Sequence, residues 1–242
     1  IILLLLLSHY SFSQDWVQLG SDIDGEAHDD FFGHSVSLSS DGTIVAIGAY
    51  GNDGNGNSSG HVRVYEWDVS AWVQRGSDID GEAAGDRGGW SVSLSSDGNI
   101  VAIGAYSNDG NGNASGHTRV YEWDGSAWNQ RGSDIDGEAA KDFSGWSVSL
   151  SSDGTIVAIA AASNNDNQTG QVRVYKWDGS AWVQRGTDLH GEAASDYFGH
   201  SVSLSSDGTI VAIGAKSNDG NGNASGHTRV YEWDGSAWNQ RG

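Results

Sequence analysis

Oxygen-bearing side chains recur at every second position in two kinds of segment of this 242-residue sequence. Carboxylate and amide oxygens at that spacing are the ligands of flexible Ca²⁺ loops, so Ca²⁺ is the candidate cofactor. Asn-Gly and Asp-Gly pairs also favour tight turns for conformational reasons alone, and a solvated hairpin is the alternative. The better metal-ligand candidates belong to acidic segments of the form D-x-D-G-E: Asp22, Asp24, Glu26, Asp78, Asp80, Glu82, Asp134, Asp136 and Glu138. The second kind of segment begins with an Asp that alternates with Asn and Gly: Asp53, Asp109 and Asp219.

A further set of candidates comes from positions at which otherwise similar repeats differ. His34 and His200 occupy the place that Trp90 and Trp146 have in the other repeats, and His190 replaces the second Asp of one acidic segment. Rings that vary between repeats are candidates for contacting a ligand, although a single His is more often structural. The Asn/Gly-rich segments also contain N-x-[S/T] patterns, which would be glycan acceptors in a eukaryotic secretory pathway: Asn57, Asn113, Asn167 and Asn223.

The sequence contains no arrangement that indicates catalysis. Catalysis needs an asymmetric set of residues, such as an acid and a base whose pKa values are separated. Here the candidate carboxylates are copied in every repeat and no Ser-His-Asp arrangement is apparent, so we expect a protein that is not an enzyme. The four repeated arginines are expected to form ion pairs or ring contacts within their repeats: Arg63, Arg119, Arg173 and Arg229.

Composition excludes several classes of protein. The sequence has 12 Lys and Arg against 32 Asp and Glu, a formal net charge of -20, and an acidic surface repels phosphate backbones. Nucleic acid is therefore not an expected partner. The absence of Cys excludes a disulfide framework, a cysteine nucleophile and thiolate metal sites.

Self-similarity determines the expected architecture. Segments of the form W-x-Q-x-G begin at five Trp residues spaced 56, 56, 54 and 56 apart, and each full unit contains four short apolar or alternating segments separated by Gly, Asn and Asp turns. Four antiparallel strands in each repeat predict an all-β protein, a β-propeller of four-stranded blades. We expect units at about 21–76, 77–132, 133–186 and 187–242, an orphan strand at 16–20, and more blades in a longer intact protein.

The segments F-F-G-H-S-V-S-L-S-S-D-G-T-I-V-A-I-G-A (31–49) and G-H-V-R-V-Y-E-W (60–67) resemble an FG-GAP repeat, the blade type of integrin-α propellers. WD-type repeats are also similar, and bacterial surface proteins are built of such tandem units. The resemblance implies a propeller fold. It does not extend to the family's calcium loop, because only a Ser-Ser-Asp-Gly turn occupies that place. We therefore expect no calcium at the Asp residues of these turns: Asp41, Asp97, Asp153 and Asp207.

The N-terminus indicates export. Residues 1–7 are apolar and too few to span a bilayer, so residues 1–13 fit the remnant of a signal peptide before repeats that occupy 14–242. We expect a secreted or cell-surface protein without a membrane span in this sequence.

Alternation of loops along an up-and-down blade places the acidic and the Asn/Gly-rich segments at the same end of the strands, which makes that face anionic. The sequence thus predicts an extracellular binding or adhesion module that presents acidic loops to a protein or glycan partner, with Ca²⁺ as a candidate aid. The alternatives are a structural spacer array and, more weakly, a propeller enzyme acting on glycosides.

Overall fold

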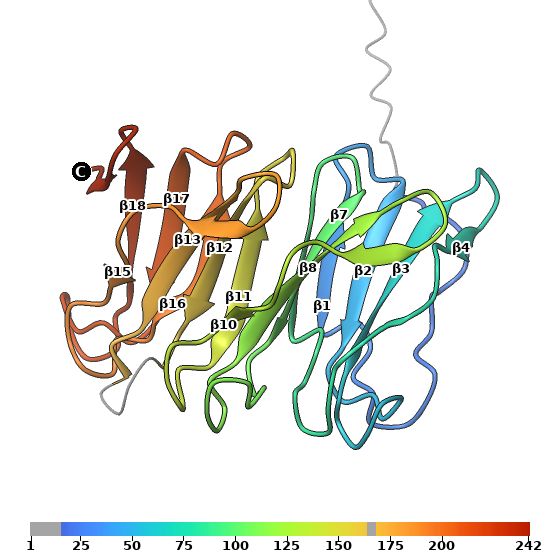
Figure 1. Ribbon diagram of the computed structural model, residues 1–242, viewed down its shortest axis with the longest axis horizontal. Helices are drawn as coiled ribbons and strands as arrows, with labels where there is room; N and C mark the ends of the chain where they lie inside the picture. The colour runs from blue at the N-terminus through green and yellow to red at the C-terminus, as the bar shows by residue number, and fades with distance from the viewer. Residues whose placement is uncertain (1–15, 164–167) are drawn as a thin grey trace, which may run out of the picture.

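A computed structural model describes residues 16–163 and 168–242 (Figure 1). The expected signal-peptide remnant, residues 1–13, and the candidate glycan acceptor Asn167 lie outside the described residues. Within the described part of the chain, no helix is long and apolar enough to cross a membrane.

Four antiparallel sheets follow one another along the chain, and each is one blade. Blade 1 contains β1 (Ser35–Leu38), β2 (Ile44–Ala49), β3 (His61–Trp67) and β4 (Trp72–Gln74). Blade 2 contains β6 (Ser91–Leu94), β7 (Ile100–Ala105), β8 (His117–Trp123) and β9 (Trp128–Gln130). Blade 3 contains β11 (Ser144–Leu150), β12 (Ile156–Ala161), β13 (Gln171–Trp177) and β14 (Trp182–Gln184). Blade 4 contains β16 (Phe198–Leu204), β17 (Ile210–Ala215), β18 (His227–Trp233) and β19 (Trp238–Gln240). The all-β propeller architecture expected from the repeats is confirmed.

The second strand of each blade is the centre of the core. Its I-V-A-I-G-A sequence is β-branched and apolar on both faces, as a strand enclosed on both sides requires. In blade 2 every residue of β7 is buried. The two faces of this strand belong to different interfaces, because alternate side chains point to opposite sides. Ile44 and Ala46 of blade 1, for example, share a core with Val92 and Leu94 of blade 2.

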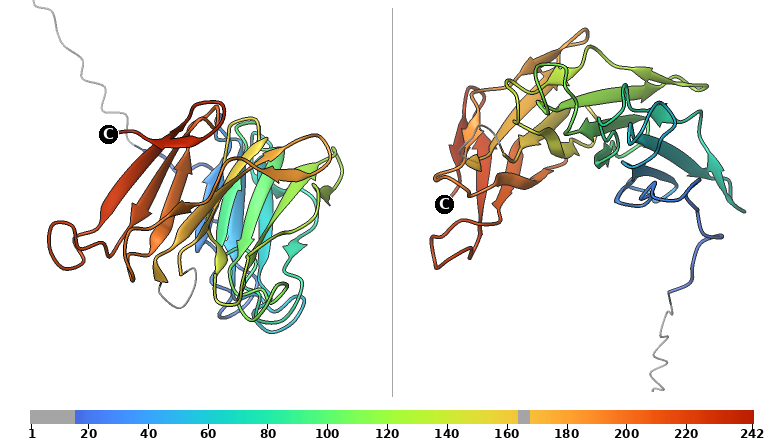
Figure 2. Two further views of the ribbon diagram at one scale, coloured as in Figure 1. Left: turned by 60° about the vertical axis from the view of Figure 1, so that its left-hand side comes forward. Right: turned by 90° about the horizontal axis from the view of Figure 1, so that it is seen from below.

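The first strands of successive blades lie next to one another, and the four blades follow an open arc (Figure 2). Serine hydroxyls on these strands accept hydrogen bonds from the next blade: Leu94 N–H donates to Ser37 Oγ and Leu150 N–H to Ser93 Oγ, both at 2.9 Å. This contact explains why the apparently polar S-V-S-L strands pack well at the inner side of the arc.

The Gly of the G-A pair in one repeat meets, at this inner contact, the Gly that precedes the first strand of the next repeat. A Cβ on Gly48 of β2 would lie 2.1 Å from the carbonyl oxygen of Gly89, which precedes β6 in the next blade. Gly89 itself has a φ of 83°, in the left-handed region that glycine adopts without strain. At the junction of blades 1 and 2, the close approach therefore depends on glycine at both positions.

The outermost strand of a blade has two parts. After β4, the chain passes Arg75 and then forms β5 (Ile79–Asp80), which pairs with the start of β3 on the edge where β4 pairs with its end. In blades 2 and 3 the equivalent short strands are β10 (Ile135–Asp136) and β15 (Leu189–His190). The acidic segments that follow blades 1, 2 and 3, expected to be loops, are thus partly strand, whereas the first acidic segment contains no strand.

The expected orphan strand at 16–20 is not a strand. The equivalent W-x-Q segments each pair with the third strand of their own blade, which comes just before them in the sequence. No such strand lies beside residues 16–20 among the described residues. The segment still occupies the equivalent place, because Trp72 Nε1 donates to the carbonyl of Leu19 at 3.0 Å, as Trp128 Nε1 does to Arg75.

Candidate functional site

Four rings that occupy equivalent positions in the four repeats form a row along the inner strands. His34 and Trp90 directly precede β1 and β6, and Trp146 and His200 lie in β11 and β16. The ring centroids of His34 and Trp90 are 4.4 Å apart, those of Trp90 and Trp146 5.0 Å, and those of Trp146 and His200 6.1 Å. The structure thus brings together four of the five ring positions that vary between repeats.

Tyrosines at the ends of the second strands extend this row. Tyr50 contacts both His34 and Trp90, at 4.7 and 5.0 Å between centroids. Tyr106 contacts Trp90 and Trp146 in the same way, at 4.6 and 5.1 Å. Tyr106 is buried, the two Trp rings are half-buried and His34 is exposed, so the row has both a packed underside and an accessible face. We call the six residues of this set the aromatic row: His34, Tyr50, Trp90, Tyr106, Trp146 and His200.

The backbone before the aromatic row is left-handed at a non-glycine residue in all four blades. The residues are Phe31, Arg87, Phe143 and Tyr197, with φ values of 54°, 62°, 55° and 53°. This conformation is unfavourable for bulky residues and occurs most often at functional or switching sites. It lets Phe31 stack flat on Tyr50, with centroids 4.9 Å apart, and Phe143 contact Tyr106.

Two positive side chains contact rings of the aromatic row or rings next to it in sequence. Arg87 donates to the hydroxyl of Tyr106, and its guanidinium lies over the Tyr50 and Tyr106 rings. Lys216 Nζ lies 4.9 Å from the centre of the Tyr197 ring. Burial lowers the pKa of both His34 and His200, and the Lys216 charge lowers that of His200 further. Both imidazoles are therefore neutral at physiological pH.

The acidic segments lie at the same end of the strands as the aromatic row, and those after blades 1, 2 and 3 are each attached to two blades. Arg119 of β8 donates to the carbonyl of Asp80 at 2.7 Å and lies 3.5 Å from the Glu82 carboxylate, while Asp80 pairs with His61 of blade 1. Equivalent arginine contacts hold the other acidic segments, through Arg63, Arg173 and Arg229. The arginines thus form the expected ion pairs, and each guanidinium also lies over the Tyr ring two residues later in its own strand. The ion pairs of Arg119, Arg173 and Arg229 are with acidic segments that also pair with the preceding blade.

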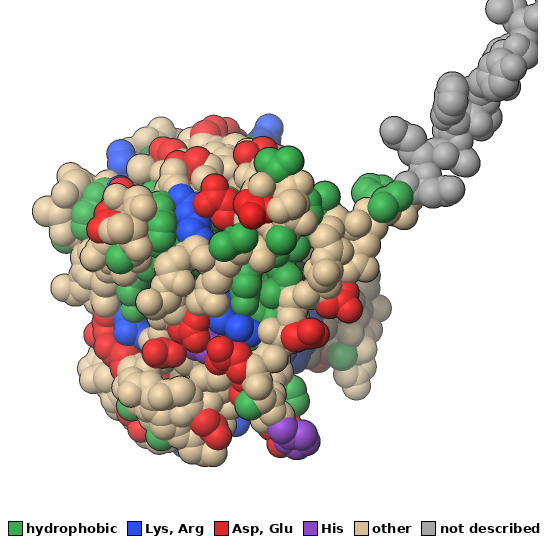
Figure 3. Space-filling model, turned by 90° about the vertical axis from the view of Figure 1, so that its right-hand side faces the viewer, with side chains coloured by type: hydrophobic (Ala, Val, Ile, Leu, Met, Phe, Trp, Pro, Cys, Tyr) green, Lys and Arg blue, Asp and Glu red, His purple; other side chains and the backbone are tan. Residues whose placement is uncertain are grey.

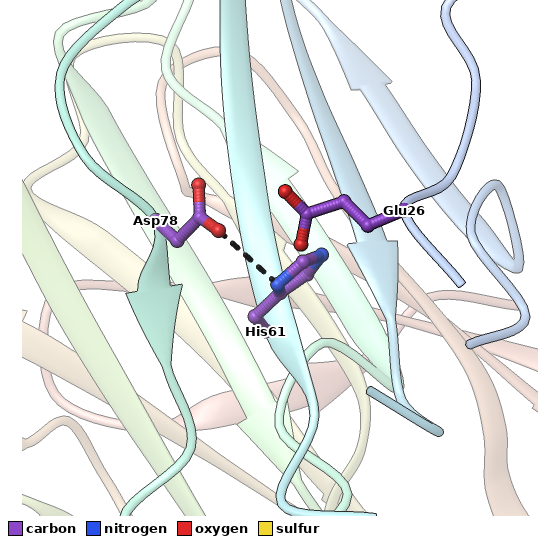
Figure 4. A group of neighbouring side chains, drawn as sticks. All are labelled: Glu26, His61 and Asp78. Carbon is purple, nitrogen blue, oxygen red and sulfur yellow. Dashed lines mark ion pairs between the residues drawn. The ribbon is translucent and has the colours of Figure 1, made fainter. Parts of the chain in front are cut away.

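The three carboxylates of one acidic segment do not converge. Among the described residues, Asp22, Asp24 and Glu26 form no group in which all three offer an oxygen to one ion. Instead, the Glu of one segment and the first Asp of the next converge on the His that begins the third strand between them. Figure 4 shows Glu26, His61 and Asp78, and Glu82, His117 and Asp134 repeat the group. His190 is not part of either group, and its carbonyl accepts a hydrogen bond from Arg229.

The buried histidines of these groups are surrounded by opposed charges. Burial lowers the pKa of His117 well below its ordinary value, Arg119 lowers it further, and the Asp134 and Asp86 carboxylates oppose that shift. Burial lowers the pKa of His61 as well, against the effect of Asp78. The rings are therefore neutral near pH 7, and their contacts with carboxylates are not ion pairs.

The Asn/Gly-rich segments use their polar groups internally. Asp53 Oδ1 accepts from the Ser58 N–H at 2.8 Å, and the Asn55 amide donates to the carbonyls of Gly81 and Glu82 in the next acidic segment, both at 2.9 Å. Asp109 and Asp219 make the same backbone contact with Ala114 and Ala224. The candidate acceptors Asn57, Asn113 and Asn223 are exposed.

The Ser-Ser-Asp-Gly turns likewise satisfy their own carboxylates. Asp41 accepts from the Ser39 hydroxyl and from the N–H and hydroxyl of Thr43, which lowers its pKa to about 2. A carboxylate engaged in this way is a turn-stabilising group.

A set of buried aspartates was not singled out by the sequence. Asp86 is 4% exposed, and its Oδ2 accepts from the Ala83 N–H and from the Asn108 amide, both at 3.0 Å. Asp30 and Asp196 repeat these bonds with Asn52 and Asn218. The signal in the sequence is the constant separation of this Asp from an Asn in three repeats.

The fold and the repeated contacts define a β-propeller assembled from four-stranded blades. Residues 21–65, 78–121 and 190–231 match the FG-GAP repeat family. These matches cover more than half of the sequence, and the chain belongs to the FG-GAP repeat family. The unmatched third repeat is the one in which Ala160 replaces the Gly of the G-A pair.

Solved structures with similar folds include hydrazine synthase from Kuenenia stuttgartiensis, with a TM-score of 0.56 and 11% identity over 91% of this chain and 52% of that chain. A putative 6-phosphogluconolactonase from Bacteroides uniformis has a TM-score of 0.56 and 12% identity over 86% of this chain and 52% of that one. At such identities the likeness shows the fold alone. The chain spans about half the length of these structures. No curated protein matches the sequence.

Proposed function

We propose that the chain is a non-enzymatic, extracellular binding module that takes up a basic segment of a partner protein across the aromatic row. The observation that carries the proposal is the continuity of this row. His34, Trp90, Trp146 and His200 come from four different blades, yet each ring contacts the next or a shared tyrosine. The rings are only partly covered, so their faces are available to a ligand.

Charge favours a basic partner. Aromatic faces attract guanidinium and ammonium groups, as the Arg87 contact with Tyr106 illustrates. Arg87 and Lys216 themselves repel a basic partner at the rings they cover, so the attraction rests on the uncovered rings and on the acidic segments. The acidic segments at the same end of the strands add a negative field, and Asp and Glu predominate among the charged side chains on the side of blade 1 (Figure 3). A net charge of -20 would accelerate association with a basic partner and make it sensitive to salt.

The left-handed residues support a functional role for the row. Phe31, Arg87, Phe143 and Tyr197 repeat an unfavourable backbone conformation in all four blades, and two of them, Phe31 and Phe143, place an aromatic ring against a tyrosine of the row. Strain that persists in every copy must be offset by surrounding contacts, and it commonly positions side chains for binding.

Secretion or cell-surface display is part of the proposal. The apolar stretch at residues 1–7 and membership of the FG-GAP family support it. Calcium assistance is not part of the proposal, because the described carboxylates of one acidic segment do not converge on a common point.

A glycan is the second candidate partner, and the flat stacking of Phe31 on Tyr50 favours it because apolar ring faces also pack on sugar rings. An array of peptides graded in Lys and Arg content, probed beside a glycan array, separates the two. Binding that rises with basic content supports the first proposal, and binding to uncharged glycans alone supports the second. An absence of ligands on both arrays would favour a structural spacer, whereas turnover of a polysaccharide would contradict a non-enzymatic role.

A further inference from the structure

A group of one imidazole and two carboxylates recurs in the first two blades, and none of its residues belongs to the aromatic row. In the second copy, His117 begins β8, Glu82 comes from the acidic segment before blade 2, and Asp134 comes from the one after it. Nδ1 of His117 lies 3.7 Å from Glu82 Oε2 and 3.6 Å from Asp134 Oδ2. The first copy has the same three residue types, His61, Glu26 and Asp78 (Figure 4).

The His117 nitrogen lacks a partner. The residue is 1% exposed, and within residues 16–163 and 168–242 its Nδ1 has no hydrogen-bond partner, although it points at two carboxylates. Distances of 3.6 and 3.7 Å are too long for hydrogen bonds. A buried polar atom without a partner is unusual in a native structure, so this group lacks a component that would satisfy it.

A metal ion fits these distances and donors. Ligands about 2.0–2.1 Å from a tetrahedral ion are about 3.4 Å from one another, close to the separations around His117. One nitrogen and two carboxylate oxygens suit Zn²⁺, whereas Ca²⁺ prefers oxygen ligands alone.

The other oxygens of the two carboxylates are already engaged. Asp134 Oδ1 accepts from the Gln130 amide at 2.6 Å, and Glu82 Oε1 lies 3.5 Å from Arg119. These contacts orient the remaining oxygens towards His117, as partners behind metal ligands commonly do.

We propose that Glu82, His117 and Asp134 bind Zn²⁺, with water completing the coordination, and that Glu26, His61 and Asp78 form a second site of the same kind. Each ion would connect two successive acidic segments to the strand between them. The sites would therefore reinforce the blade junctions, and they are independent of the function proposed for the aromatic row.

The third repeat provides a natural comparison. Gln171 occupies the position of His117 there, and its amide donates to Glu138 Oε2 at 3.0 Å, so a hydrogen bond takes the place of the ion. His227 of the fourth repeat has only Glu192 nearby, at 3.9 Å, among the described residues. The sequence thus supplies two complete ligand sets and, at Gln171, a substitution that this fold accepts.

The experiment is a calorimetric titration of the full chain with Zn²⁺, joined to thermal melting with and without the ion. We expect the wild type to bind two Zn²⁺ ions, the His117→Gln variant one, and the His61→Gln/His117→Gln double variant none. We also expect Zn²⁺ to raise the melting temperature of the wild type but not that of the double variant. Circular dichroism should show both variants folded. A His28→Gln variant, which changes an exposed ring, should retain both sites. Unchanged Zn²⁺ binding in the double variant, or no binding by the wild type, would overturn the proposal.

Discussion

His34 and Trp90 pack ring against ring, with 4.4 Å between their centroids, although they occupy the same position of two successive repeats. The contact exists because the first strands of the two blades lie side by side and each ring is at the same end of its strand. Repetition of this relationship turns single, weakly informative positions into a continuous surface. The binding function that we propose depends on that surface and not on any one residue.

The first prediction concerns the glycine contact that allows the first strands to approach. Gly48→Ala should destabilise the fold by about 1–3 kcal/mol, because the new Cβ would lie 2.1 Å from the Gly89 carbonyl and 2.4 Å from Ser35 Oγ. Urea denaturation measures the change. The matched control is Ala160→Gly at the equivalent position of blade 3, where we expect a loss of only about 0.5–1 kcal/mol from added backbone freedom. Equal effects of the two substitutions would contradict the account of this contact.

The second prediction concerns the buried aspartates. Asp86→Ala should destabilise by about 1–3 kcal/mol, because it leaves the Ala83 N–H and the Asn108 amide without their acceptor. Glu232→Ala is the control: its carboxylate and its partner Arg241 are both more than half exposed, and we expect a change within about 0.5 kcal/mol. A loss no larger in Asp86→Ala than in the control would show that the buried network does not stabilise the loop.

The third prediction is a pH dependence. Hydrogen bonds from Ser205 and Thr209 lower the pKa of Asp207 from 3.8 to about 2. Because the folded-state pKa lies below the ordinary value, the bonds contribute stability above pH 3.8 that is lost as the pH falls through about 2. Carbon-detected NMR titration of the carboxyl signal, assigned with Asp207→Asn, should show this midpoint. Asp41 has equivalent bonds and should titrate at a similar pH, and a midpoint near 3.8 at both residues would refute the turn geometry.

The strands and their order could be predicted because local composition determines them. The I-V-A-I-G-A segments are apolar on both faces, and the Trp-led repeats fix four strands in each unit. Segment 16–20 has the same local pattern as β4 but forms no strand, since pairing needs a third strand beside it. Local pattern therefore predicts a strand only where its partner is also present.

The sites were less accessible to sequence reasoning, because they depend on distances across blade junctions. The sequence indicates Asp78, Glu82 and Asp134 as metal-ligand candidates, but the spacing within one segment predicts that neighbours in sequence share an ion. The packing of the blades instead brings Glu82 and Asp134 to His117, which no local pattern indicated. The sequence shows that the position of His34 and Trp90 varies between repeats, but their contact follows only from the adjacency of the first strands.

The most direct test of the proposed function is the binding of a Lys/Arg-rich peptide by the wild type and by the Trp90→Ala/Trp146→Ala pair. Exposed Val183→Ala serves as the matched surface control. We predict that the wild type and the control bind the peptide, and that raising the NaCl concentration weakens this binding about tenfold or more. The Trp90→Ala/Trp146→Ala variant should lose binding, while its circular dichroism remains that of a folded propeller. Full binding by the folded Trp pair, or no binding by the wild type to any peptide of the series, would contradict the account.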